Sequence, residues 1–233
     1  MQSINLDKSL PFGRSNRVVQ KINPKTTALL VVDMQKFFLQ PGAPAYIVGG
    51  GLSPSGKDTI LRAKKVVDYS RQKGIIVLWS MWGLRKDGRD TGLWKNKFPT
   101  WWGPKSPNGP DWNDPLISIV DELKPRDDEV VFQKTRYSSF YETPLDTWLR
   151  GKGIETLIVI GVTTGFCVRY TVADAFNRNY KTVVLADCTS AINDPSCVAE
   201  GDKQYLAALA DFQIGLADVL TSDEFMNLPI VSS

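Results

Sequence analysis

The stretch Thr156–Cys167 reads TLIVIGVTTGFC and combines an apolar run with the turn that follows it. Its first part, Thr156–Gly161, is almost continuously apolar, which is typical of a strand covered on both faces. The glycines and threonines after it indicate a turn that leads into a helix over Phe166–Asn179. A buried strand followed directly by a helix is the repeating unit of a parallel sheet.

The same alternation extends in both directions along the chain. We expect strands at Thr27–Asp33, Ile75–Ser80, Glu129–Gln133 and Thr182–Asp187, helices at Lys57–Lys73, Leu116–Leu123, Pro144–Lys152 and Pro195–Phe212, and a short last strand around Gln213–Asp218. Near-continuous apolar strands that alternate with helices need cover on both faces of the sheet. The sequence therefore predicts an α/β protein, with a three-layer α/β/α, Rossmann-like fold and a central, mostly parallel sheet of about six strands.

The length of 233 residues predicts one domain over residues 1–233. Residues 1–25 read as an irregular lead-in. Residues 82–112 are rich in Trp, Gly, Pro and charge, and a loop of this length in a compact domain is usually functional. One interpretation is a lid in which Trp82, Trp94 or Trp101 excludes water from a site. The other is that the tryptophans pack the loop onto the body or form a subunit contact.

Composition excludes several classes of partner. The net charge is +3 with scattered Lys and Arg, so we expect no nucleic-acid partner. No stretch reaches the roughly 18–20 apolar residues of a membrane span, and the first residues lack the apolar core of a secretory signal. Three cysteines are too few and odd in number for a disulfide framework. We therefore expect a cytoplasmic protein with no membrane partner.

The chain contains no histidine, and this restricts its chemistry most. Ser-His-Asp and Cys-His catalysis are excluded, as is any metal site with a histidine ligand. Closely spaced cysteine pairs, which a Cys-rich zinc site would need, are also missing. We expect no metal and no cofactor, and the chemistry must use Asp, Glu, Lys, Cys, Tyr or backbone groups.

Ligands of open parallel sheets bind outside the carboxyl ends of the strands. Asp33 ends the first predicted strand, Lys134 follows the third, and Cys167 lies near the start of the helix after the fourth. A carboxylate, an ammonium and a thiol are therefore expected to converge. Taken alone, each residue could have a purely structural role: Asp33 could form a turn, Lys134 could be solvated, and Cys167 could be a small buried side chain. We assign the other two cysteines, Cys188 and Cys197, to structure.

Together the three groups suit nucleophilic catalysis. A lysine cation and the positive end of a helix lower the thiol pKa from its free value of about 8.5. The carboxylate takes the thiol proton and later gives it to a leaving amine, while the lysine holds the carboxylate in place. Backbone N–H groups of the GVTTGFC turn are candidates to stabilise the oxyanion.

At these residues the sequence resembles the isochorismatase-like hydrolase superfamily. The matching segments are ALLVVDMQKFF (Ala28–Phe38), FQKTRYSSFYETPLDTWLRGKGI (Phe132–Ile154) and VIGVTTGFCVRYTVADAFNRNYKTVVLADCTSA (Val159–Ala191). The resemblance puts Asp33, Lys134 and Cys167 on the catalytic positions of the family. It also implies a cis peptide bond between Val162 and Thr163, with the backbone N–H groups of Thr163 and Cys167 aimed at the oxyanion.

Within the superfamily, the missing histidines argue against nicotinamidases, and Cys167 argues against true isochorismatases, which cleave a vinyl ether. The resemblance is greatest to ureidoacrylate amidohydrolases, with biuret hydrolases and N-carbamoylsarcosine amidohydrolases as near relatives. It implies cleavage of a C–N amide or ureido bond of a small molecule through a covalent acyl-enzyme. Other amides (biuret, a carbamoyl amino acid, maleamate), an ester, and a non-catalytic binding module remain as alternatives.

The resemblance also suggests substrate contacts and assembly. It places Tyr137 and Asn96 against the substrate, and we expect Trp82 and Phe38 to join them. The chain departs from the ureidoacrylate group after the second strand, where that group carries Asn and Trp and this sequence has Ser80-Met81-Trp82. Family members are often dimers or tetramers, so we expect a homo-oligomer.

Overall fold

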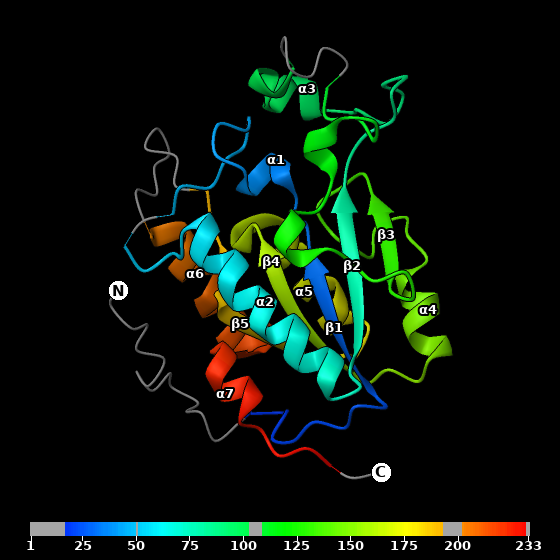
Figure 1. Ribbon diagram of the computed structural model, residues 1–233, viewed down its shortest axis with the longest axis vertical. Helices are drawn as coiled ribbons and strands as arrows, with labels where there is room; N and C mark the ends of the chain where they lie inside the picture. Colours follow the sequence, from blue (N-terminus) through cyan, green and yellow to red (C-terminus); the bar gives the residue numbers. More distant parts are fainter. Residues whose placement is uncertain (1–16, 50, 103–108, 193–201, 232–233) are drawn as a thin grey trace.

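A computed structural model describes residues 17–49, 51–102, 109–192 and 202–231 (Figure 1). Its centre is a six-stranded sheet in the order β3-β2-β1-β4-β5-β6, and every neighbouring pair is parallel. The strands are β1 (Thr27–Val32), β2 (Ile76–Trp82), β3 (Val130–Lys134), β4 (Thr156–Val162), β5 (Lys181–Ser190) and β6 (Asp218–Leu220). The predicted three-layer α/β/α architecture is confirmed.

Helices cover both faces of the sheet, which is why the central strands are apolar throughout. One face carries α1 (Lys36–Leu39), α2 (Gly56–Gln72) and α7 (Ser222–Met226), and the other carries α4 (Leu145–Gly151), α5 (Arg169–Asn177) and α6 (Lys203–Asp211). Along β1, Leu29 and Val31 belong to the first core, while Ala28 and Leu30 belong to the second. Side chains of a strand alternate between its faces, so all six residues of β1 are buried.

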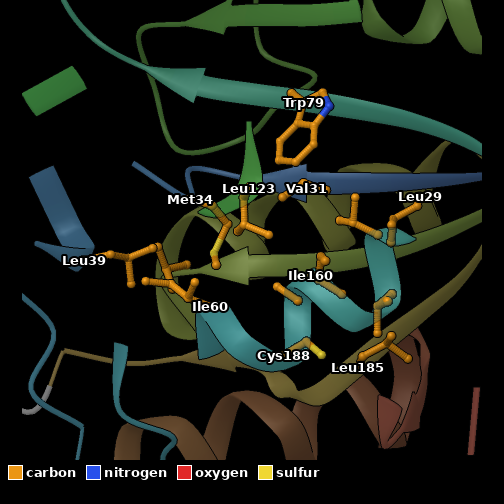
Figure 2. Packing of buried hydrophobic residues seen from close by; sticks show 14 of the residues in the cluster. Leu29, Val31, Met34, Leu39, Ile60, Trp79, Leu123, Ile160, Leu185 and Cys188 are labelled. Atoms are coloured by element: carbon orange, nitrogen blue, oxygen red, sulfur yellow. The ribbon is translucent and has the colours of Figure 1, made fainter. Parts of the chain in front are cut away.

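Figure 2 shows the core under α2, which includes Val31 of β1, Ile160 of β4 and Ile60 of the helix. Trp79 of β2 is fully buried at one side of this core, and its indole N–H donates to Glu129 Oε2 at 2.7 Å. Cys188 is also buried in this core, in agreement with its structural assignment. Cys197 lies outside the described residues.

The predicted helix over Leu116–Leu123 is wrong. Two short 3₁₀ turns, Pro115–Ile117 and Asp121–Leu123, flank an extended piece instead. The backbone there pairs with the segment after β1: Lys36 N–H donates to Ser118 O at 2.9 Å, and Val120 N–H donates to Met34 O at 3.0 Å. Hydrogen bonds to a distant segment replace those of a local helix.

The carboxy-terminal part also differs from the sequence prediction. The last strand is β6 at Asp218–Leu220, not Gln213–Asp218, because α6 continues into a π-helical turn over Phe212–Leu216. The predicted start of that helix at Pro195 lies outside the described residues. The short helices α1 and α7 were not predicted. Within the described residues, none of the helices has the length and hydrophobicity needed to cross a membrane.

The predicted loop over residues 82–112 begins with the last residue of β2, and its described part, 82–102 and 109–112, contains the helical turn α3 (Trp94–Lys97) and the 3₁₀ turn Pro99–Trp101. In Figure 1, α3 lies beyond the arrowhead of β2, at the carboxyl end of the sheet. The Trp-rich segment is therefore on the side of the sheet where ligands of this architecture bind.

Gly161 controls how β4 approaches β1. Its φ of +116° is a conformation that side chains rarely adopt, and a Cβ there would lie 2.0 Å from the carbonyl oxygen of Val32. The pairing of β4 with β5 shifts between Val159 and Gly161, just before the chain enters the turn that carries Cys167. Only glycine permits this approach without displacing the β1 backbone.

We predict that Gly161→Ala destabilises the protein by more than about 3 kcal/mol, because backbone strain and a backbone clash act together. Gly151→Ala is the matched control: it lies in α4 with nothing within 4 Å of the added Cβ. We expect its effect to stay within about 1 kcal/mol of the parent. Urea unfolding followed by circular dichroism measures both. Equal stability of the two variants would contradict the assigned role of Gly161.

Candidate active site

The carboxyl ends of three strands bring Asp33, Lys134 and Cys167 together. Lys134 Nζ lies 2.7 Å from Asp33 Oδ2 and 3.4 Å from Cys167 Sγ, although β2 separates β3 from β1. The side chains of Asp33 and Lys134 have no exposed surface. The third contact of the ammonium is the carbonyl of Arg136 at 3.1 Å. An ammonium has three donors, so these contacts occupy all of them.

The segment after β1 holds Asp33 in an unusual backbone conformation. Its φ is +49°, and its N–H donates to Ser80 O on β2 at 2.9 Å. Gln35 fixes this segment further: its side-chain oxygen accepts from Trp82 N–H at 2.9 Å, and its Nε2 donates to Trp82 O and Ile117 O at 2.7 and 2.6 Å. Gln35 lies in the segment Ala28–Phe38 that carries the family resemblance, but no local pattern predicted this bridging role.

A chain of hydroxyl groups fixes the loop after β3. Ser139 Oγ donates to Ser80 Oγ at 2.8 Å, and the Thr171 hydroxyl of α5 donates to Ser139 Oγ at 3.1 Å. The N–H of Ser139 donates to the same Thr171 oxygen at 2.9 Å. These bonds tie the loop to β2 and α5, and the loop carries Tyr137 into the site.

Cys167 lies in a π-helical turn, Thr164–Val168, that joins β4 to α5. The peptide bond between Val162 and Thr163 is cis, as the family resemblance implied. The turn closes where Phe166 and Val168 N–H groups donate to Thr163 O at 3.1 and 3.2 Å. The thiol therefore lies just before the first turn of α5, close to its predicted position. It is carried by a π-helical turn, whereas the sequence predicted the start of an α-helix.

Burial dominates the electrostatics of the thiol. It raises the pKa of Cys167 well above the ordinary value, and the charge of Asp33 raises it further, while Lys134 opposes only part of the effect. The expectation of a low thiol pKa set by the lysine and the helix end is therefore wrong for the resting site. The two charges near the thiol act in opposite directions, and burial adds to the effect of Asp33.

The two partners form a buried ion pair. Burial raises the pKa of Asp33, and the charge of Lys134 offsets part of this rise. Burial would lower the pKa of Lys134, but Asp33 and Cys167 together raise it above its ordinary value. The resting site thus holds a neutral thiol beside a carboxylate–ammonium pair. Asp33 Oδ1 is buried and has no hydrogen-bond partner among the described residues, so it is available to accept a proton.

A cavity opens above Cys167, and its wall is mostly aromatic. It is lined by Phe38, Trp82, Trp94, Phe98, Trp101, Tyr137, Thr163, Phe166, Cys167 and Ile192. The expected contact residues Phe38, Trp82 and Tyr137 are all in this wall. Asn96, which we also expected in the wall, is exposed on α3 and does not line the cavity. The helical turn of α3 buries Trp94 instead.

The sequence interpretation missed three members of this wall: Phe98, Phe166 and Ile192. Phe166 belongs to the GVTTGFC turn and was therefore visible beside the thiol. Phe98 and Ile192 are isolated apolar residues in loops, and no local pattern marks them. Only the fold brings them to the same cavity.

The Trp-rich segment packs against the body and also forms part of the cavity wall. Trp94 Nε1 donates to Thr135 O at 3.0 Å, and Arg136 Nη1 donates to Asp90 O at 2.9 Å. The rings of Trp94 and Trp101 lie 5.2 and 5.4 Å from that of Trp82. The tryptophans therefore pack onto the body, as one interpretation held, and line the cavity, while their role as a lid stays a prediction.

Comparisons with known proteins agree with this geometry. Residues 27–224 match the family described as Isochorismatase domain. The chain is similar to ureidoacrylate amidohydrolase RutB of Methylorubrum extorquens, with 32% identity over 94% of this chain and 95% of that protein. Its fold is similar to a cysteine hydrolase from Pseudomonas syringae, with a TM-score of 0.79 and 29% identity over 88% and 93% of the two chains. N-carbamoylsarcosine amidase from Thermoplasma acidophilum gives a TM-score of 0.63 and 29% identity over 85% and 97%.

We predict that Asp33→Asn speeds alkylation of Cys167 by iodoacetamide. The charge of Asp33 raises the thiol pKa and Lys134 lowers it, so removing the carboxylate leaves only the lysine beside the thiol. A fall of one pKa unit gives about tenfold more thiolate at a pH below the pKa. Peptide mass spectrometry at pH 8 measures the rate at Cys167.

Lys134→Met is the opposite variant and should slow alkylation below that of the parent. The buried Cys188 provides an internal control in the same digest, since its rate should not change unless the fold opens. Slower alkylation of Cys167 in Asp33→Asn, with an unchanged circular dichroism spectrum, would reject this account of the charges.

Proposed function

The chain belongs to the isochorismatase family, and from this membership we propose that it hydrolyses a non-peptide C–N bond of a small amide with Cys167 as the nucleophile. The observation that carries the proposal is the position of Lys134 Nζ, within hydrogen-bonding distance of both Asp33 and the Cys167 sulfur in a buried site. Similarity to a ureidoacrylate amidohydrolase and to an N-carbamoylsarcosine amidase supports amide hydrolysis as the reaction.

In the first half of the proposed reaction, the thiol proton passes to the free Oδ1 of Asp33. The sulfur forms a bond to the carbonyl carbon of the substrate, whose oxygen becomes an oxyanion. Asp33 then gives its proton to the substrate nitrogen, the C–N bond breaks, and ammonia or an amine leaves. Cys167 is left carrying the acyl group as a thioester.

The second half repeats these steps with water. The oxygen of a water molecule attacks the thioester carbon, and Asp33 takes a proton from this water. The C–S bond then breaks, the acid product leaves, and the proton on Asp33 returns to the sulfur. Throughout, Lys134 keeps Asp33 oriented and lies next to the sulfur, where its charge stabilises the transient thiolate.

The oxyanion needs donors that are already in place. We assign this role to the backbone N–H groups of Thr163 and Cys167, since both residues line the cavity. Donors fixed in a buried site cost no reorganisation during reaction, and losing one typically slows an enzyme by about 10²–10³-fold. Cys167 lies in the π turn Thr164–Val168, and Thr163 directly precedes that turn.

A ureido compound is the first substrate class to test, because the curated relatives act on ureidoacrylate. Biuret, carbamoyl amino acids, maleamate and esters follow as alternatives of the same chemistry. Ammonia release over this set separates amides from esters, since an ester releases only an alcohol and an acid.

We predict that Cys167→Ser and Cys167→Ala reduce hydrolysis by at least about 10³-fold, because the proposed route has no other nucleophile. Cys188→Ala is the matched control for loss of a buried thiol and should retain activity. Ammonia release measures turnover, and intact-protein mass spectrometry looks for the acyl group. Parent-like turnover in Cys167→Ala would remove Cys167 from the mechanism.

We predict a broad pH profile of kcat/KM set by the ion pair. Activity requires ionised Asp33, so it falls as pH drops through the pKa of Asp33, which burial raises above 3.8. It also requires charged Lys134, whose pKa is raised above 10.5, so activity should persist to about pH 10. Initial rates and circular dichroism between pH 4 and 10.5 test the acid limit and the expected persistence of activity at alkaline pH. A loss of activity between pH 8 and 9 in a folded enzyme would contradict the role of Lys134.

A further inference from the structure

Among the residues that the structure describes, those that line the cavity above Cys167 carry no charge. Of the described residues that line it, eight carry aromatic or aliphatic side chains, and the remaining two are Thr163 and Cys167. Tyr137 is the one phenol among them, and burial raises its pKa to about 12, with the Cys167 thiol contributing. It is therefore neutral at physiological pH.

Among the described residues next to the site, Lys134 and Arg136 carry a positive charge, and both have hydrogen-bond partners. All three donors of the Lys134 ammonium contact Asp33, Cys167 and the Arg136 carbonyl, and its side chain has no exposed surface. The Arg136 guanidinium donates to the carbonyls of Asp90 and Thr135. Neither Lys134 nor Arg136 lines the cavity.

A carboxylate that entered such a wall would lose its hydration without gaining an ionic partner. This transfer is costly unless the charge is paired and hydrogen-bonded. An uncharged apolar group gains from the same burial, and a flat one also stacks on the rings. The wall therefore discriminates by charge before any chemistry takes place.

We propose that the substrate is an amide whose part beside the scissile C–N bond is uncharged and apolar, best an aromatic or alkenyl group, and not a carboxylate such as ureidoacrylate. The inference rests on the proposed amide hydrolysis by Cys167 and names its substrate class. It separates this chain from the curated relatives, whose named substrate is an acid.

The test compares pairs of substrates that differ by one carboxylate group. Phenylurea is paired with 4-ureidobenzoate and cinnamamide with 4-carboxycinnamamide, and 3-ureidoacrylate is included alone. Liquid chromatography follows substrate loss with the parent protein and with Cys167→Ala as the blank. We expect kcat/KM of the uncharged member of each pair to exceed that of the acid by at least about 100-fold.

Two variants test whether the wall itself sets this preference. Phe98 is half-buried, and its ring stacks on Trp101 at a centroid distance of 4.2 Å. Phe98→Lys adds a cation to the wall and should reduce the preference for the uncharged member by at least about tenfold. Phe98→Met adds no charge and should leave the ratio within about threefold of the parent. Circular dichroism checks that both variants fold.

The outcomes distinguish this inference from the proposed function. Cys167-dependent hydrolysis that favours 3-ureidoacrylate or the acid of each pair would overturn the inference and leave the proposed function intact. An unchanged ratio in Phe98→Lys would also overturn it. If the parent turns over none of these compounds and carries no acyl group on Cys167, the proposed function itself fails.

Discussion

The buried ion pair between Asp33 and Lys134 is the interaction on which the rest of the site depends. Two charges with no exposed surface are stable only when they are close together and otherwise hydrogen-bonded. Their 2.7 Å contact requires that β1 and β3 end at the same level of the sheet, with Lys134 reaching past the intervening β2. The order of the parallel strands therefore sets the distance between Lys134 Nζ and Asp33 Oδ2. The ion pair in turn keeps the Asp33 carboxylate charged inside the protein.

The same pair explains why the thiol rests in its neutral form. Burial and the charge of Asp33 both favour the protonated sulfur, and Lys134 offsets only part of this. A protonated thiol beside an unpartnered carboxylate oxygen is ready to transfer a proton when a substrate carbonyl arrives. In the proposed reaction, activation is tied to substrate binding, and the mostly aromatic wall favours the uncharged substrates that we propose.

Hydrogen bonds between distant segments hold the positions of Asp33, Lys134 and Cys167. Gln35 joins the segment after β1 to the end of β2, and the hydroxyl chain through Ser139 joins the loop after β3 to β2 and α5. Gly161 lets β4 approach β1 before the turn that carries Cys167. Each connection links segments that are far apart in the chain, so the reactive groups are positioned by the whole sheet and not by one loop.

The sequence alone determined the first five strands of the central sheet and the position of Asp33, Lys134 and Cys167 after three of them, because apolar runs and strand-end positions are local patterns. It also predicted Phe38, Trp82 and Tyr137 near the thiol. It did not predict the paired segment around Ser118, the absence of Asn96 from the cavity wall, or the raised pKa of the thiol. These depend on burial and on charges more than thirty positions apart in the chain, which only the tertiary structure brings within a few ångströms.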